Sequence, residues 1–317
     1  MSSRSLERPF MRPHPFLWHW FALSLLALSV LGNPAGAAPG QSAGDSYPAL
    51  RSAADARLQT GLEQRLAALH LDAAVRDGRL AVALVDISEL HRPRLAAVNG
   101  ERMLYAASLP KIAILLGAFE QIENGDLPLD AEVEGALTRM IRHSSNRDAT
   151  AMMERVGPAY IAEVLQSPRY RLYDPAHNGG LWVGKVFGKS PAWRRDPLHN
   201  ISHGASALQV ARFYYLMATG RLVSPGASAR MQAILGEPAI AHKFVKGLAR
   251  SAPEARLYRK SGSWKRWHAD SALVEHGQFR YIAVALAESP RGGAWLEQLI
   301  VGLDDLVCGD GPRLAGG

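Results

Sequence analysis

Residues 108–125 read SLPKIAILLGAFEQIENG, and the segments on either side of this stretch complete the fold. Its apolar residues recur at helical spacing, and its closing Asn-Gly pair is typical of a helix C-cap. The stretch therefore predicts a helix that begins close to Ser108. At the start of such a helix, Ser108 and Lys111 lie on one face about one turn apart.

Ser108 and Lys111 together have the chemistry of an activated nucleophile. A serine hydroxyl is a weak nucleophile unless a neighbouring base takes its proton. A buried lysine readily loses its own proton and then serves as that base, and the positive end of a helix stabilises negative charge near Ser108. The alternative is an N-cap serine beside a solvated lysine. A Ser-x-x-Lys pattern alone is weak evidence, since average residue usage gives about one chance match in a chain of this size.

Hydrophobic patterns on both sides of this helix predict an α+β fold. Strand-like runs bounded by turn residues lie towards both ends of the chain, whereas the middle is mostly helical. This order predicts an antiparallel sheet flanked by N-terminal and C-terminal helices, with an all-helical lobe inserted between the strands. Residues 167–204 lack periodicity and are expected to form a long loop that is either functional or disordered. The expected helices are 51–70, 109–122, 137–156, 205–217 and 293–307, and the expected strands are 80–87, 94–98, 256–261, 269–274 and 279–287.

The first 37 residues have the order of a secretory signal peptide. Three arginines precede an apolar stretch at 16–31, and the small residues at 35–37 fit an A-x-A cleavage site. The alternative is an uncleaved N-terminal anchor. We therefore expect an exported, periplasmic or secreted protein that is monomeric and has no stable membrane anchor after cleavage. The expected organisation is a signal peptide (1–37), a linker (38–50), a catalytic domain (51–310) made of an α/β lobe (51–107 and 225–310) and a helical lobe (108–224), and a tail (311–317).

Composition excludes several other classes of protein. The formal net charge is +7, but the basic residues form no run and no nucleic-acid motif is present, so the expected partner is a small anionic molecule. The single cysteine, Cys308, rules out an internal disulfide and is expected to be a small apolar residue. The eleven histidines show no clustered ligand spacing, so no metal and no cofactor are expected. The absence of a G-x-S-x-G elbow argues against an α/β-hydrolase.

Two further motifs follow the serine and lysine in the chain. Ser144-Ser145-Asn146 lies in a turn-like part of the helical region, and Lys260-Ser261-Gly262 lies on an expected strand. Taken singly, the first is compatible with a polar turn or cap, and the second with an ordinary exposed strand end. Together with Ser-x-x-Lys, and in this order, they resemble the S-x-x-K, S-D-N and K-T-G motifs of bacterial class A β-lactamases and penicillin-binding proteins.

The resemblance covers roughly residues 51–310, judged by element order, and it implies a role for each motif residue. Ser145 stands where the family often has Asp, and Ser261 stands where it has Thr. The implied catalytic residues are Ser108 as nucleophile, Lys111 as acylation base and Ser144 as the relay of a proton to the leaving nitrogen. The implied substrate-binding residues are Asn146 for a substrate amide, Lys260 and Ser261 for a carboxylate, Gly262 for close approach of the ligand, and Ser263, whose backbone N–H would join that of Ser108 in an oxyanion hole.

A deacylating carboxylate is also implied by the resemblance. Residues 174–178, Asp-Pro-Ala-His-Asn, resemble the family's E-P-x-L-N pattern, and Arg171 lies just upstream, where the family has an arginine. Asp174 and Asn178 would then position the hydrolytic water. Asp is one methylene shorter than Glu, and a misplacement of about 1 Å can cost about 10²-fold in rate. The alternative is an ordinary turn opened by Asp-Pro.

The resemblance implies a serine hydrolase that forms an acyl-enzyme. The first expected reaction is hydrolysis of the β-lactam amide bond, which would give antibiotic resistance. Ser108 and Ser144 are only 36 positions apart, and the loop after Asp174 is extended through 179–195, so the cleft need not prefer β-lactams. One alternative is a D-Ala-D-Ala carboxypeptidase, or another cell-wall amidase or esterase, acting on a peptidoglycan-like peptide. Another is a non-catalytic penicillin-binding or sensing module, against which the complete set of motif residues argues.

Overall fold

The computed structural model describes residues 47–309. The expected signal peptide (1–37), most of the expected linker (38–50) and the expected tail (311–317) lie outside the described residues. Within 47–309, no helix is both long enough and apolar enough to cross a membrane. The expected division of the catalytic domain into two lobes stays a prediction.

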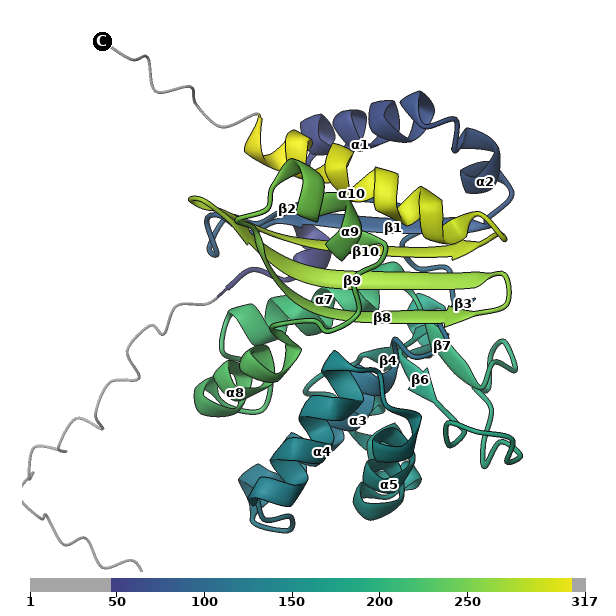
Figure 1. Cartoon of the computed structure of the whole chain (residues 1–317), viewed down its shortest axis with the longest axis vertical. Coiled ribbons are helices and arrows are strands. Elements are labelled where there is room, and N and C mark those ends of the chain that lie inside the picture. Colours follow the sequence, from purple (N-terminus) through teal and green to yellow (C-terminus); the bar gives the residue numbers. More distant parts are fainter. Residues whose placement is uncertain (1–46, 310–317) are drawn as a thin grey trace, which may run out of the picture. The chain divides into compact units, whose positions relative to one another are not determined.

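A five-stranded antiparallel sheet lies at the centre of the described unit, with strand order β2-β1-β10-β9-β8 (Figure 1). Short turns join its last three strands in chain order, because antiparallel neighbours need only a tight connection. All five predicted strands are present, and the predicted α+β fold is confirmed. The strands are β1 (Leu80–Asp86), β2 (Arg94–Val98), β8 (Arg256–Trp264), β9 (Trp267–His276) and β10 (Phe279–Glu288).

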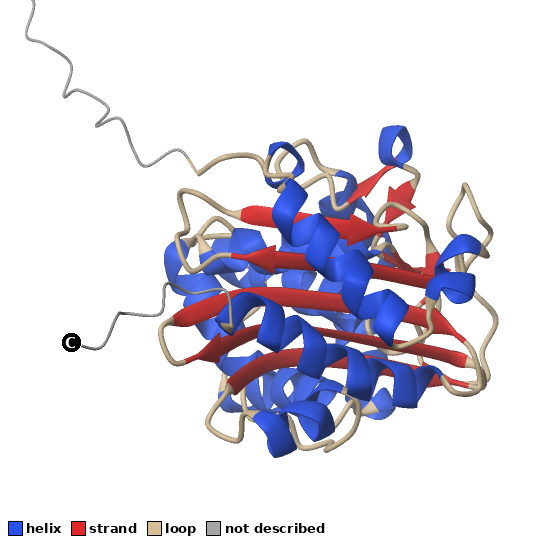
Figure 2. Cartoon of the chain, turned by 90° about the horizontal axis from the view of Figure 1, so that it is seen from above, coloured by secondary structure: helices blue, strands red, loops and turns tan. Residues whose placement is uncertain are grey.

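Alternation along β1 divides the core between the two faces of this sheet. Leu80 and Leu84 pack among the helices from the two ends of the described chain, whereas Ala81 and Val85 pack among the helices from its middle. Every residue of β1 is buried, which explains its unbroken apolar sequence. The helices on the first face, visible in front of the strands in Figure 2, are α1 (Ala56–Ala68), α2 (Asp72–Arg76), α9 (Phe244–Ser251) and α10 (Gly292–Cys308).

The helices on the other face include a break that the sequence pattern did not predict. Residues 137–156 were expected to form one helical pattern, but the structure divides them between α4 and α5. Ser144 has a left-handed φ of 54°, and the Ser145 side chain caps the next helix by accepting a hydrogen bond from Asp148 N at 3.2 Å. The helices on this face are α3 (Lys111–Asn124), α4 (Ala131–Arg142), α5 (Asn146–Val156), α6 (Pro158–Gln166), α7 (Ala207–Ala218) and α8 (Pro225–Leu235).

The segment 167–204 contains more regular structure than its sequence predicted. It forms four short strands, and two of them join the short strand β3 in a three-stranded sheet with order β3-β7-β6. This small sheet lies at the right-hand end of β8 in Figure 1, with β6 and β7 drawn below that strand, and its pairing of β3 with β7 holds the chain that precedes Ser108. The short elements are η1 (Leu50–Ser52), β3 (Leu104–Tyr105), β4 (Tyr173–Asp174), η2 (Pro175–His177), β5 (Gly179–Gly180), β6 (Trp182–Val183) and β7 (His203–Ala205).

Candidate active site

Ser108 lies in a tight turn immediately before α3, not within the helix itself. The helix was expected from 109 onward but begins at Lys111, because Leu109 N donates to Ala106 O and Lys111 N to Ser108 O in short-range bonds. Ala107 has a left-handed φ of 52°, a conformation that non-glycine residues rarely adopt and that often marks a functional site. The turn is fixed from outside by the bond from Ala106 N to His203 O of β7, at 2.8 Å.

Lys111 is buried one turn along from Ser108 and points toward the loop between α4 and α5. Its Nζ donates to Ser144 O at 2.6 Å and to Asn146 Oδ1 at 2.8 Å, and it lies 4.6 Å from the centre of the Phe187 ring. Burial lowers the pKa of Lys111 to about 7, although the negative charge of Asp148 opposes the shift. The lowered pKa makes the neutral form of Lys111, which a proton acceptor requires, accessible near neutral pH.

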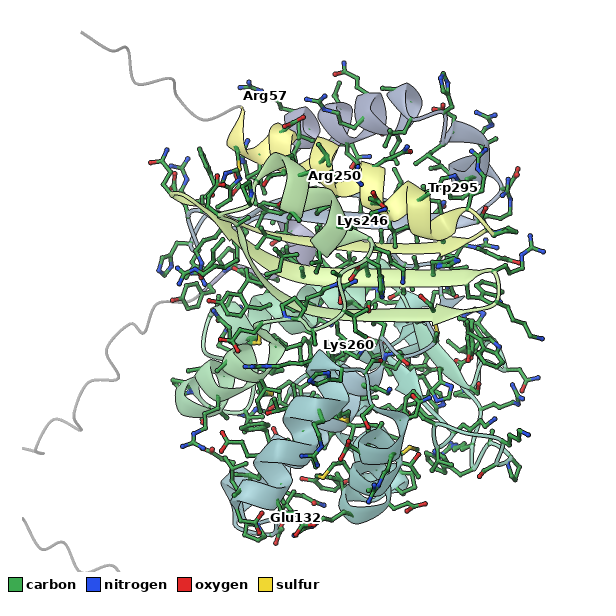
Figure 3. All side chains as sticks on the ribbon, in the orientation of Figure 1. Arg57, Glu132, Lys246, Arg250, Lys260 and Trp295 are labelled. Carbon is green, nitrogen blue, oxygen red and sulfur yellow. The ribbon has the colours of Figure 1, made fainter. Side chains whose placement is uncertain are left out.

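A second buried lysine, Lys260, contacts Ser144 from the side of the sheet. Lys260 Nζ on β8 donates to Ser144 Oγ at 2.9 Å and to Ser261 O at 2.7 Å, and Figure 3 shows Lys260 between the sheet and the helices below it. Burial lowers the pKa of Lys260 well below its usual value, and the positive charge of Lys111 adds to the shift. Ser144 Oγ lies 3.4 Å from Lys111 Nζ as well, so the hydroxyl links the two amino groups.

Gly262 lets strand β8 pass directly against the Ser108 turn. A Cβ at this position would lie 2.1 Å from Ala106 O and 2.8 Å from Ser108 N. Any residue with a Cβ atom would overlap these backbone atoms, so the close approach of β8 to the turn requires the glycine of the third motif. The backbones of Ser108 and of the β8 end that carries Ser263 are thereby held side by side.

Lys243 supports the same strand end and was not predicted from the sequence. Its Nζ is buried and donates to Gly262 O at 2.6 Å, to Ser263 Oγ at 2.8 Å and to Ala269 O at 3.1 Å. Burial lowers the pKa of Lys243 to about 8 despite the charge of Asp270. Lys243 has a left-handed φ of 52° just before α9, and no local sequence pattern signals that arrangement.

A cavity of about 890 Å³ opens in front of Ser108. Its walls come from the Ser108 turn, from the loop that runs through 179–195 and from the β8–β9 turn. Glu288 is the only carboxylate among the described residues that line it, whereas several cations do so. Such a cleft attracts anionic molecules. The lining includes Arg102, Tyr105, Ser108, Asn146, Lys185, Phe187, Lys189, Arg195, His203, Ser263, Trp264, Lys265 and Trp267.

Asp174 and Asn178 are not among the residues that line this cleft, and the deacylating role that the resemblance implies for them stays a prediction. Asp174 lines a separate pocket, pairs with Arg171 at 2.9 Å and caps η2 through Ala176 N. Asn178 Nδ2 donates to Glu101 O at 3.0 Å. These local bonds are those of a turn opened by Asp-Pro, which was the alternative interpretation of this stretch.

His203 is a cleft residue that the sequence did not single out. Burial lowers the pKa of His203 to about 4, so its imidazole is neutral near pH 7. Its Nε2 lies 3.0 Å from Lys185 O, which accepts a hydrogen bond and leaves Nδ1 as the unprotonated nitrogen. His203 lines the cleft, and Lys111 lies buried next to the Ser108 turn. Burial lowers the pKa of both groups, which favours the neutral forms that can accept a proton.

One cluster within residues 47–309 has side chains that could hold a metal ion. His276, Asp304 and Cys308 bring their ligand atoms within 4.8 Å of one another on the α10 side of the sheet. Burial alone would lower the pKa of His276, but the hydrogen bonds and charges of Asp304 and Glu254 outweigh it and raise that pKa. Burial and Asp304 raise the pKa of Cys308 to about 12. The thiol thus has polar neighbours, in contrast to the purely apolar role expected for it.

Comparison with known proteins identifies the class to which this site belongs. The model of the β-lactamase enzyme family (Beta-lactamase2) matches residues 61–136 and 132–303. The chain therefore belongs to the β-lactamase enzyme family, a family of hydrolases that act on small molecules. The predicted resemblance to class A β-lactamases and penicillin-binding proteins is confirmed.

Solved structures of the same architecture are distant in sequence. A β-lactamase from Sphaerobacter thermophilus is 17% identical with a TM-score of 0.61, over 78% of this chain and 96% of that chain. PBP-A is 16% identical with a TM-score of 0.58, over 79% and 95%. A class A β-lactamase representative from Bacteroides cellulosilyticus is 15% identical with a TM-score of 0.58, over 78% and 96%. At these identities the likeness shows the fold. No curated protein sequence matches the chain.

Proposed function

We propose that the chain is a serine hydrolase that works through an acyl-enzyme on Ser108, with the β-lactam amide as its first candidate substrate. The observation that carries the proposal is the linked set Lys111–Ser144–Lys260 next to the Ser108 turn. Two buried lysines with lowered pKa values share one hydroxyl, and this arrangement supplies both a proton acceptor and a path for the proton.

In the proposed acylation, neutral Lys111 takes the proton of Ser108 Oγ as that oxygen bonds to the substrate carbonyl carbon. The negative charge on the carbonyl oxygen is stabilised by the backbone N–H groups of Ser108 and Ser263. When the C–N bond breaks, Ser144 donates its proton to the leaving nitrogen and regains one through the lysines. Water then cleaves the Ser108 ester and restores the free enzyme.

The proposed substrate carries a carboxylate next to the scissile amide. Lys260 and Ser261 precede Ser263, which lines the cleft, on strand β8, and the cationic lining attracts an anion. Asn146 lines the cleft and holds Lys111, so its amide group is placed to contact a substrate amide. The proposal also includes export to the periplasm or outside the cell, based on the signal-like order of residues 1–37, and a monomeric state.

One observation favours the second candidate, a D-Ala-D-Ala carboxypeptidase or a related cell-wall amidase or esterase. Fast hydrolysis of a β-lactam acyl-enzyme needs a base for the attacking water, and Asp174 is outside the cleft. Glu288 pairs with Arg266 at 3.5 Å. A site that acylates well and deacylates slowly would retain penicillin while turning over a different acyl donor.

Intact-protein mass spectrometry of the chain mixed with benzylpenicillin separates the candidates, with Ser108→Ala as control. An adduct that clears within seconds while the drug disappears supports a β-lactamase. An adduct that persists for many minutes supports the second candidate. If the wild type forms no adduct with penicillin or with peptide and ester acyl donors, the proposed acyl-enzyme is refuted.

A further inference from the structure

A second cavity, of about 300 Å³, lies away from Ser108 between the start of the described chain, the turn that contains Asp174 and helix α7. We call it the arginine pocket, because five arginines line it together with a single carboxylate, that of Asp174. The arginines come from four separate parts of the chain. They are Arg51, Arg169, Arg171, Arg212 and Arg221.

Carboxylate partners are fewer than these guanidinium groups. Arg51 pairs with Glu101, Arg169 with Glu120 at 3.4 Å, and Arg171 with Asp174 at 2.9 Å. The other two arginines donate to neutral oxygens among the described residues: Arg212 to the carbonyls of Arg171 and Tyr170, and Arg221 to Thr219 Oγ1 and Tyr47 O. Five positive charges thus face three negative ones, which leaves an excess of two.

Part of this positive charge is buried, although Arg221 is exposed. Burial lowers the pKa of Arg212 to about 10, and the positive charge of Arg51 is the next cause. The pKa of Arg51 is likewise lowered, first by burial. Arg51 Nη2 is buried with no hydrogen-bond partner among the described residues. A buried donor without an acceptor and a buried charge without a counter-charge are both costly, and an oxyanion in the pocket removes both costs.

We propose that the arginine pocket is a binding site for a phosphate group, either inorganic phosphate or a small phosphomonoester. A phosphate dianion matches the excess of two charges, and its oxygens accept the paired N–H groups of several guanidinium forks at once. A single carboxylate supplies half of that charge. The cavity volume equals that of roughly ten water molecules, so it holds a phosphate with room for an attached group. This site is independent of the function proposed for Ser108.

Isothermal titration calorimetry of the full chain with inorganic phosphate at low ionic strength tests the site. We expect saturable binding of one phosphate, weakened at least about tenfold by Arg212→Gln, which removes a charge-assisted contact. Arg230→Gln, an exposed arginine on α8, and Lys189→Gln, in the Ser108 cleft, should change affinity by less than about twofold. A parallel titration with glycerol 3-phosphate shows whether an ester or the free anion is preferred.

Three results would overturn the proposal. The first is the absence of saturable heat with either phosphate probe. The second is unchanged affinity in Arg212→Gln, and the third is lost affinity in Lys189→Gln, which would move the binding to the Ser108 cleft. If circular dichroism shows that Arg212→Gln does not fold, the exposed Arg221→Gln takes its place with the same expected loss.

Discussion

The Ser108 cleft and the arginine pocket are two cationic cavities of the described unit. They differ in the type of basic side chain that is buried beside them. The cleft buries lysines, Lys111 and Lys260, that share the hydroxyl of Ser144. The pocket gathers arginines that are paired in part with Glu101, Glu120 and Asp174.

This difference determines what each cavity can do. A buried lysine can lose its proton near neutral pH, whereas arginine stays charged under all ordinary conditions. The cleft can therefore move protons, and the pocket can only hold an anion in place. Asp174, which sequence similarity assigned to the first cavity, lies in the second, where its charge offsets that of Arg171.

Lys111→Arg should have the largest effect, because it gives the cleft the chemistry of the pocket. The positive charge remains, but the side chain can no longer accept the Ser108 proton. We expect the rate of acylation by benzylpenicillin to fall by about 10²- to 10⁴-fold. Rapid-quench sampling followed by intact-protein mass spectrometry measures that rate.

The matched control is Lys246→Arg on α9, which keeps a surface ion pair with Glu297 and should acylate like the wild type. A Lys111→Arg protein that is folded and acylates within a few-fold of the wild type would show that lysine deprotonation is not needed.

Gly262→Ala should have an intermediate effect, because it disturbs the cleft without altering any of its charges. The new methyl group would meet Ala106 O and Ser108 N, so strand β8 must move away from the turn. We expect a loss of about 10²-fold in acylation rate from misplacement and a decrease of about 1–3 kcal/mol in the free energy of unfolding.

Acylation kinetics and urea unfolding check both effects of Gly262→Ala. Gly226→Ala in α8, at a position with no atom within 4 Å of the added group, is the control that should leave acylation unchanged and should not destabilise the fold. Normal acylation by Gly262→Ala would mean that the close approach of β8 to Ser108 has no catalytic value.

Asp174→Asn should have the smallest effect on catalysis, since Asp174 lies in the arginine pocket. Both the acylation rate and the lifetime of the penicillin adduct should stay within about twofold of the wild type. The adduct lifetime is read by mass spectrometry after excess drug is removed. A lifetime longer by tenfold or more would return Asp174 to the role of deacylating base and would remove the contrast between the two cavities.

Sequence patterns predicted the elements whose signal is local. The buried run of β1 and the bounds of β2 follow from short-range hydrophobic patterns, and so does α3 apart from its first turn. The three motifs also lie close together in space. Ser144 is hydrogen-bonded both to Lys111 and to Lys260, which is more than a hundred positions away in the sequence.

The errors concern features that depend on distant parts of the chain. An Asp-Pro turn has the same local sequence whether it faces Ser108 or a group of arginines, and Arg51 and Arg212 come from far along the chain. The contacts of Lys243 arise only when α9 packs on the sheet. The apolar period runs on from α4 into α5, so the break is signalled in the sequence only by the polar Ser144-Ser145-Asn146 and is fixed by the left-handed φ of Ser144.

The most direct test of the central claim, that a neutral buried lysine activates Ser108, is the pH dependence of the acylation rate under single-turnover conditions. Because the pKa of Lys111 is lowered to about 7, its neutral fraction rises with pH below that value and saturates above it. The rate should therefore rise with a midpoint near pH 7 and level off about one to two pH units higher, and this step should be absent from the residual rate of Lys111→Arg. A rate that is flat across this range, or one that keeps rising toward pH 10 as for an ordinary exposed lysine, would contradict the account.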